Sequence, residues 1–261
     1  PRPLVLALHP GGGRTPYYGG MFMQQIVAPA LRDWNAIIVA PDCPTRAWTS
    51  DVAERAVLAL LDQVLADHPI DRERILVTGF SLGGRGAWFM ATHHPDRFTG
   101  AIVVAGSPRD DPLDALGEMP VAVIHSRADD VVPFEPARRA VDLLEERDRP
   151  VRFTELRGVG HFTMDDYIEP LREAGEWMRV QWGEQAVPEV EERADRGRVV
   201  EHLLARRRRQ PLRQGIGAGT GFRDSGGPGR APAKHPVSGS AGSGTRVARL
   251  DPEGWERERS G

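Results

Sequence analysis

Short apolar runs alternate with longer amphipathic segments through the first two thirds of the chain. The apolar runs predict buried strands at residues 4–8, 36–40, 75–78, 101–105, 121–124 and 151–154. Apolar side chains at helical spacing predict helices at residues 21–32, 51–67, 84–92, 136–146 and 169–182. Continuous apolar strands between helices are typical of a mostly parallel, doubly wound sheet with helices on both faces. In such α/β sheets, binding sites form at the carboxyl ends of the strands.

This pattern ends near Gly183, where the composition changes. Four consecutive arginines at 206–209 are followed by frequent glycines from 215 to 229 and a Ser/Gly stretch at 238–244. We therefore expect one folded domain at residues 1–183 and an Arg/Gly/Ser-rich tail at 184–261. The tail is expected to be disordered apart from one helix at 188–209. Its basic run fits a solvated charge run or an anionic-surface contact, and the whole end also fits a reading-frame artefact.

Composition and charge narrow the class of protein. Hydrophobic residues make up 40% of the 261 residues and charged residues 27%, as in ordinary globular proteins. The net charge of −3 argues against a nucleic-acid partner. The single cysteine, Cys43, excludes an intrachain disulfide and is interpreted as a packing residue.

No apolar run approaches the roughly 20 residues of a membrane span. The lack of a recognisable signal peptide favours the cytoplasm, but the chain begins at Pro1, so compartment and oligomeric state are left open.

The clearest local motif is Gly-Phe-Ser-Leu-Gly at residues 79–83, between a predicted strand and a predicted helix. At such a turn, Gly-x-Ser-x-Gly lifts the serine hydroxyl above the sheet as a nucleophile. Ser81 is therefore the candidate nucleophile. The alternative is a glycine-rich turn capped by a serine.

A nucleophilic serine needs a base, and the base needs an acid that orients it. With this motif the acid and then the histidine follow the serine along the chain. Asp129 and Asp130 follow the strand predicted at 121–124, and His161 follows the strand at 151–154. We predict His161 as the base and prefer Asp129 to Asp130 as the acid.

The sequence His-Pro-Gly-Gly-Gly at residues 9–13 follows the first predicted strand. Glycines there let backbone N–H groups approach a developing oxyanion. Because Pro10 has no N–H, the donor in this loop is Gly11 or Gly12, and we favour Gly11. The second predicted donor is the N–H of Leu82. Gly12, Tyr17 and Trp48 are candidate substrate contacts, and loop anchoring is an equally good account of the two aromatic residues. A phosphate-binding loop would need a lysine that is missing here.

Together these stretches resemble the α/β-hydrolase superfamily. The similarity runs over residues 4–182 and is greatest to esterases of the phospholipase/carboxylesterase, polyhydroxybutyrate-depolymerase-like and dienelactone-hydrolase-like groups. The similarity is found in the stretches at residues 8–13, 39–44, 78–87, 125–133 and 158–161. The family's acid motif places its aspartate at Asp129. Dienelactone hydrolases proper have a cysteine where this chain has Ser81, which argues against that activity.

The sequence also departs from the usual pattern of this family. The usual first strands are missing before residue 4, which would leave a sheet edge exposed. The segment between the strands at 101–105 and 121–124 is too short for a large helical lid. An open cleft of this kind favours soluble or polymer-end esters.

We therefore expect a serine hydrolase that cleaves carboxylic esters (EC 3.1.1 type) through an acyl-enzyme, with no cofactor. No group of residues has metal-ligand spacing. One alternative is a serine peptidase of the prolyl-oligopeptidase type, which shares the fold and the triad. Another is a non-catalytic binding member of the fold. The acyl and alcohol groups of the substrate are left open.

Overall fold

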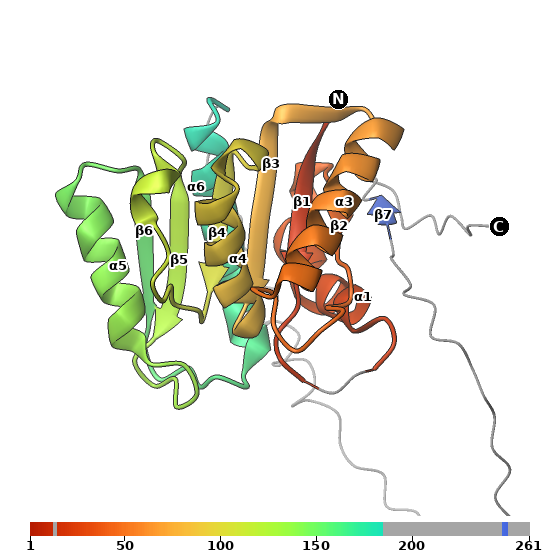
Figure 1. Ribbon diagram of the computed structural model, residues 1–261. Coiled ribbons are helices and arrows are strands. Elements are labelled where there is room, and N and C mark those ends of the chain that lie inside the picture. Colours follow the sequence, from red (N-terminus) through yellow and green to blue (C-terminus); the bar gives the residue numbers. More distant parts are fainter. Residues whose placement is uncertain (13–14, 185–246, 250–261) are drawn as a thin grey trace, which may run out of the picture. The chain divides into compact units, whose positions relative to one another are not determined.

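A mostly parallel sheet lies at the centre of the domain (Figure 1). The computed structural model describes residues 1–12, 15–184 and 247–249. In this part of the chain the strand order is β6-β5-β4-β3-β1-β2-β7, and each neighbouring pair is parallel except β2 and β7. The strands are β1 (Arg2–Leu8), β2 (Ile37–Val39), β3 (Ile70–Phe80), β4 (Gly100–Val104), β5 (Val121–Ser126), β6 (Val151–Leu156) and β7 (Val247–Arg249).

Helices cover both faces of this sheet, as predicted. The α-helices are α1 (Tyr18–Phe22), α2 (Ala28–Ala30), α3 (Asp51–Asp67), α4 (Leu82–His93), α5 (Phe134–Glu146) and α6 (Ile168–Gln181). Short 3-10 helices lie at η2 (Arg32–Trp34), η3 (Pro95–Arg97), η4 (Leu113–Leu116) and η5 (Met164–Tyr167), and η1 (Met23–Val27) is a π-helical turn. In Figure 1, α3, α4 and α5 lie in front of the sheet, with α1 and α6 behind it.

The alternation of side chains along β1 separates the hydrophobic core into two layers. Leu4, Leu6 and Leu8 pack with residues of α3, α4 and α5, whereas Val5 and Ala7 pack with α1, α2 and α6. All five are fully buried. Successive side chains of a strand point to opposite faces, so a sheet covered on both sides needs an uninterrupted apolar strand.

The helix predicted at residues 21–32 is divided into several short pieces. A π-helical turn at Met23–Val27 separates α1 from α2. Pro29 stands at the start of α2, and its missing N–H interrupts the α-helical hydrogen bonding that precedes it. By contrast, α3 has the predicted bounds, and the Ser50 side chain caps its first turn by accepting the Ala53 N–H at 3.3 Å.

Two features lie within the expected tail. Glu184 is the first residue of that tail, and its carboxylate forms ion pairs with Arg74 and Arg179, each at 2.6 Å. Strand β7, at residues 247–249 of the expected tail, pairs antiparallel with β2, which the sequence did not indicate. The predicted helix at 188–209 and the rest of the tail lie outside the described residues.

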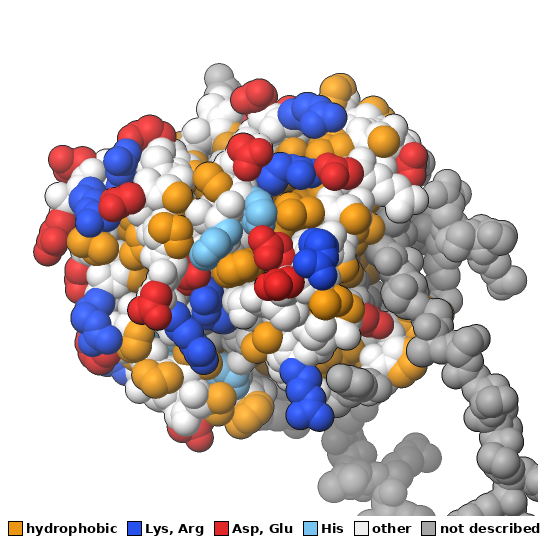
Figure 2. Space-filling view, viewed as in Figure 1, with side chains coloured by type: hydrophobic (Ala, Val, Ile, Leu, Met, Phe, Trp, Pro, Cys, Tyr) orange, Lys and Arg blue, Asp and Glu red, His pale blue; other side chains and the backbone are white. Residues whose placement is uncertain are grey.

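Two observations concern the described helices and the face drawn in Figure 2. None of the helices in the described ranges combines the length and the apolar character needed to cross a bilayer. On the face drawn in Figure 2, acidic and basic side chains are interspersed over α3, α4 and α5. Such mixing gives little long-range attraction for a polyanion on this face.

Candidate active site

Ser81 lies in the turn between β3 and α4, at the carboxyl end of the central strand. Its backbone has φ 55° and ψ −114°, a conformation that L-residues rarely adopt. The Ser81 N–H donates to the Val104 carbonyl at 2.9 Å, and its own carbonyl accepts the Arg85 N–H at 2.9 Å. Such backbone conformations cost on the order of 1–3 kcal/mol and collect at functional sites. We call residues 79–84 the elbow.

The glycines of the elbow are required by the close approach of backbone segments. A Cβ atom on Gly83 would lie 1.8 Å from the Leu8 carbonyl oxygen, and one on Gly79 would lie 2.2 Å from the Gly83 oxygen. Because both distances are far below contact, neither position has room for a side chain. The turn can therefore lie directly against the end of β1 only with glycine at these two positions.

His161 connects Ser81 with Asp129. The Ser81 hydroxyl lies 2.8 Å from His161 Nε2, and His161 Nδ1 lies 2.7 Å from Asp129 Oδ2. An ionised carboxylate only accepts, so Nδ1–H donates to Asp129 and Nε2 is free to accept the serine proton. His161 is 4% exposed and Asp129 is 9% exposed.

The orientation of Asp129 is fixed by its own loop. Its Oδ1 accepts the backbone N–H groups of Val131 at 2.9 Å and Val132 at 2.8 Å, which leaves Oδ2 for His161. Asp130, the other acid considered, is exposed. The structure thus brings Ser81, Asp129 and His161 together and leaves Asp130 outside this group.

The predicted oxyanion donors are neighbours in space. A Cβ atom on Gly11 would lie 3.7 Å from Leu82 Cβ. Leu82 is the first residue of α4, and the first N–H groups of a helix have no carbonyl partner within it. The positive end of the helix dipole also favours negative charge at this point. At Gly12, a Cβ atom would lie 2.7 Å from the Tyr18 hydroxyl, so the end of that side chain would have to move to admit a larger residue.

Residues 9–12, which we call the glycine loop, are held by side chains far away in sequence. His9 Nε2 accepts the Cys43 N–H at 2.9 Å, so His9 Nδ1–H donates to the Pro10 carbonyl at 2.7 Å. Burial lowers the pKa of His9, which favours this neutral form. The Trp48 indole N–H donates to the His9 carbonyl at 3.0 Å. Trp48 is only 1% exposed, which favours the anchoring role over a substrate contact.

Asp42 holds the segment that follows the glycine loop. Its carboxylate accepts the N–H groups of Tyr17 and Gly19, both at 2.8 Å. These donors lie at the start of α1, where no side chain of the helix itself provides a cap. Tyr17 has φ 64° and is about half exposed. Cys43 is partly buried against the core, in agreement with a packing role.

Sequence reasoning missed an aromatic group beneath the site. The Tyr167 ring packs edge-on against Phe80, the residue before Ser81, at 5.1 Å between centroids, and Phe80 lies 5.2 Å from the His161 ring. Burial and the charge of Asp129 raise the pKa of Tyr167, so its hydroxyl stays protonated. No local motif marks Tyr167, because its contacts are made through η5, a segment remote from the elbow in sequence.

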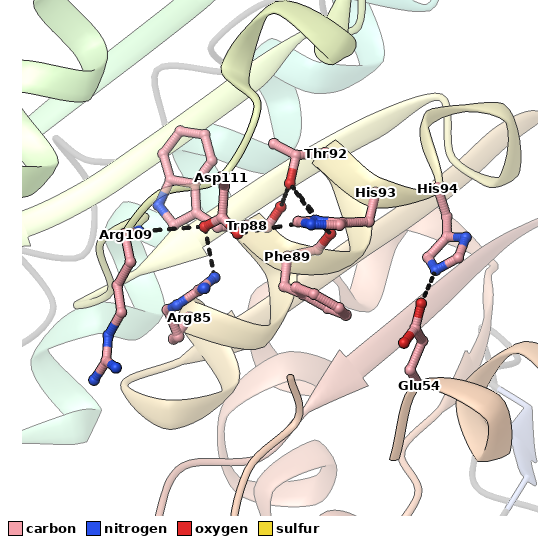
Figure 3. A network of polar contacts seen from close by, with 9 residues as sticks. All are labelled: Glu54, Arg85, Trp88, Phe89, Thr92, His93, His94, Arg109 and Asp111. Carbon is pink, nitrogen blue, oxygen red and sulfur yellow. Dashed lines mark hydrogen bonds and ion pairs between the residues drawn. The ribbon is translucent and has the colours of Figure 1, made fainter. Parts of the chain in front are cut away.

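The loop after β4 is fastened to α4 by an ion pair (Figure 3). Arg85 Nη1 lies 2.6 Å from the Asp111 carboxylate, whose side chain is 3% exposed, and the same carboxylate accepts the Arg109 N–H at 3.3 Å. Along the same helix, His94 contacts Glu54 of α3 at 2.7 Å. Since Arg85 follows Ser81 by one helical turn, the ion pair fixes the loop beside the elbow. The single helical turn in this loop is η4.

The described residues contain no group of three or more His, Cys, Asp or Glu side chains that could hold a metal ion. Around Ser81 they bring together an acid and an imidazole, and the predicted oxyanion donors belong to the glycine loop and to the start of α4. This is the set of groups that nucleophilic acyl transfer uses.

Comparison with known proteins gives the class and then the family. Residues 26–186 match the dienelactone hydrolase family, so the chain belongs to that family. Its relatives and structural neighbours are esterases of the α/β-hydrolase fold, which confirms the predicted fold class. The family and the fold are thus established for this chain, and its activity is a proposal.

Two relatives illustrate the match. The putative esterase NocK of Nocardia uniformis subsp. tsuyamanensis is 34% identical over 79 residues, which are 30% of this chain and 23% of that protein. The probable feruloyl esterase C of Aspergillus flavus is 29% identical over 152 residues, covering 52% of each chain. The chain therefore spans about half or less of the length of these curated relatives.

Solved structures agree with the fold. A thermostable esterase superposes with a TM-score of 0.60 at 28% identity, over 69% of this chain and 54% of that one. Arabidopsis thaliana SOBER1 gives a TM-score of 0.52 at 19% identity, over 69% of this chain and 99% of that one. At this low identity SOBER1 supports the fold alone.

Proposed function

We propose that the protein is a serine hydrolase that cleaves carboxylic esters through an acyl-enzyme intermediate. Ser81 is the nucleophile, His161 the general base and Asp129 the acid that orients it. The N–H groups of Gly11 and Leu82 stabilise the oxyanion. The observation that carries the proposal is the pair of contacts made by His161, 2.8 Å to the Ser81 hydroxyl and 2.7 Å to Asp129.

In the first half of the reaction, Ser81 Oγ attacks the ester carbonyl carbon and its proton passes to His161 Nε2. The carbonyl oxygen becomes an oxyanion beside Gly11 and Leu82, where backbone donors and the start of α4 favour negative charge. As the tetrahedral intermediate collapses, the bond to the alcohol breaks. His161 then gives its proton to the leaving alcohol oxygen, leaving an acyl group on Ser81.

In the second half, water replaces the alcohol. His161 accepts a proton from the water, whose oxygen attacks the acyl carbon, and the proton then returns to Ser81 Oγ as the carboxylic acid leaves. Asp129 stays ionised throughout and stabilises the imidazolium that forms in both halves. The hydrogen bonds that the Val131 and Val132 N–H groups donate keep this carboxylate in place.

The proposal is tested with a fluorophosphonate probe and a panel of p-nitrophenyl esters. We expect the probe to label the folded protein at Ser81, and Ser81→Ala to lose both labelling and ester hydrolysis while its melting temperature is retained. Near-normal turnover by Ser81→Ala would overturn the proposal. A folded protein that is neither labelled nor active would instead support the non-catalytic binding member of the fold.

The two adjacent acids provide a matched pair for the role of Asp129. Asp129→Asn should lower kcat by up to about four orders of magnitude, as loss of the acid does in serine-protease triads, because the imidazole would no longer be held in the productive tautomer. Asp130→Asn should have a much smaller effect. The reverse ranking would move the acid by one position.

The substrate panel should include esters suggested by the relatives. A feruloyl ester and a 3-hydroxyalkanoate oligomer are suitable, since a probable feruloyl esterase C and a poly(3-hydroxyalkanoate) depolymerase C are among the proteins that this chain matches. Peptide amides in the same panel test the peptidase alternative. Cleavage of the amides in preference to the esters would contradict the assignment as an esterase.

A further inference from the structure

Some exposed apolar side chains lie on or next to the loops that carry the proposed catalytic groups. In the part of the chain that the structure describes, six large hydrophobic residues are exposed: Tyr17, Met21, Val52, Val131, Phe162 and Val180. Tyr17 follows the glycine loop, Val131 lies in the loop of Asp129, and Phe162 follows His161 directly. Phe162 is 81% exposed. The folded chain therefore leaves this ring in contact with water, although burying it would be favourable.

The turn that carries Phe162 is closed by hydrogen bonds. The Thr163 hydroxyl and N–H both donate to the Gly160 carbonyl, at 2.9 and 3.3 Å, and so close the turn that carries residues 160–163. The Phe162 ring stands edge-on to the imidazole of His161, at 5.4 Å between centroids and 88° between planes. An aromatic face is thus presented to solvent next to the proposed base.

The chemistry of the base indicates which part of a substrate meets this ring. His161 Nε2 must give its proton to the leaving oxygen, so this oxygen comes within about 2.6–3.2 Å of Nε2 during acylation. The first atoms of the alcohol then lie beside the imidazole, and its larger substituents extend toward the adjacent ring. The acyl group is bonded to Ser81 Oγ and remains there after the alcohol has left.

We propose that Phe162 is a specificity residue for the alcohol side of the ester, selecting substrates whose leaving alcohol carries an aromatic or other flat apolar group. This inference rests on the proposed esterase function and adds to it the class of alcohol. Offset or edge-to-face contact between Phe162 and the ring of the alcohol lowers the free-energy barrier to acylation by such esters. Deacylation, which takes place after the alcohol has gone, does not depend on Phe162.

The test has two series of esters, each with one half held constant. The alcohol series consists of methyl, benzyl and 2-phenylethyl acetates, followed by proton release. The acyl series consists of p-nitrophenyl acetate, butyrate and octanoate. For each ester, kcat/KM of Phe162→Ala is divided by that of the wild-type protein, so that the intrinsic reactivity of the ester cancels.

We expect the ratio to stay near one for methyl acetate and to fall about three- to tenfold for the two aromatic alcohols. In the acyl series, where the leaving group is constant, the ratio should be the same for all three esters. Phe162→Leu, which keeps apolar bulk but loses the ring, should lie between the wild type and Phe162→Ala. Val180→Ala, at an exposed apolar position on α6, should leave every ratio near one.

Two results would overturn the inference: equal ratios for all three acetates, or a ratio that changes with acyl length. Melting temperatures close to wild type are expected for Phe162→Ala, since an exposed ring contributes little to stability. Failure of the esterase proposal is recognised separately, because the wild-type protein would then show no hydrolysis that depends on Ser81 in either series.

Discussion

The elbow at residues 79–84 and the glycine loop at residues 9–12 lie side by side but are held in different ways. The elbow is fixed by backbone packed on backbone, with no space for a Cβ at Gly79 or Gly83. The glycine loop is fixed by polar side chains, through His9 and Trp48. One half of the site therefore depends on the absence of side chains and the other half on their presence.

This difference predicts different responses to substitution. A backbone contact has no freedom to rearrange, so a clash in the elbow must move β1 or α4. Hydrogen bonds from side chains can be lost one at a time, each with a limited effect. Substitutions in the elbow should therefore disturb folding, and those around the glycine loop should disturb activity more than folding.

The largest expected effect is that of Gly83→Ala. Its new Cβ would lie 1.8 Å from the Leu8 carbonyl oxygen, so we expect a loss of at least about 3 kcal/mol in the free energy of unfolding, the upper end for overpacking. Gly160→Ala is the control, since nothing lies within 4 Å of its Cβ position, and its stability should match the wild type. Chemical denaturation measures both. A Gly83→Ala protein as stable as Gly160→Ala would show that the elbow is not sterically fixed.

Next in size is Asp42→Ala, which removes the acceptor of the Tyr17 and Gly19 N–H groups. We expect a loss of about 1–3 kcal/mol in the free energy of unfolding, as for donors that lose their partner. We expect kcat/KM to be reduced by a larger proportion than stability, because the glycine loop shifts. Asp33→Ala, at an exposed carboxylate that pairs with Arg32 at 3.6 Å, is the control. If Asp42→Ala unfolds more easily yet keeps full activity, the loop does not depend on this support.

A smaller effect should appear as a dependence of stability on pH. Burial lowers the pKa of His9 below its ordinary value of 6.5, so the folded state binds fewer protons than the unfolded chain just below that pH. The contribution of neutral His9 to the free energy of unfolding is therefore complete above pH 6.5 and is lost as the pH falls below that value. Burial also lowers the pKa of His125, which adds in the same direction.

Melting temperatures between pH 7.5 and 5 measure this dependence. They should fall as the pH is lowered, and the fall should be less steep in His9→Asn, although this variant is less stable at pH 7.5. A slope that His9→Asn leaves unchanged would show that His9 does not couple the glycine loop to pH.

The smallest effect is expected from truncation after Glu184, which leaves the elbow, the glycine loop and their supports intact. Activity should be unchanged, and the melting temperature should move by no more than a degree or two, against roughly 2–4 °C per kcal/mol for a domain of this size. Truncation after Gly183 also removes the ion pairs of Glu184 with Arg74 and Arg179. Since these groups are partly exposed, the further loss should stay below about 1 kcal/mol. A large loss from the first truncation would mean that β7 or other tail residues stabilise the sheet.

The fold could be predicted from the sequence where local patterns determine the structure. Helix α3 combines a Ser50 cap with regular apolar spacing, and its bounds were predicted without error. Strand β3 was predicted only at residues 75–78, but it begins at Ile70. In its partly exposed first half, Ile70 pairs with Arg2 of β1, and such pairing between distant segments leaves no apolar pattern.

The candidate site divides in the same way. Ser81, Asp129 and His161 were found from short motifs next to strands, and the structure brings them together. The contributions of Asp42 and Tyr167 could not be predicted, and the two roles considered for Trp48 could not be distinguished, because each residue acts through contacts with segments that only the tertiary fold brings close. Trp48 shows the limit most clearly, since an aromatic residue in a loop looks the same in sequence whether it faces substrate or core.

The backbone of Ser81 has a consequence for the engineering of this protein. Its φ of 55° would be relaxed by glycine, so Ser81→Gly should make the domain more stable while removing the proposed nucleophile. Stability and activity are thus in conflict at this one residue. Selection for thermal tolerance alone would favour loss of the serine, and a screen for more robust variants must therefore require turnover at every round.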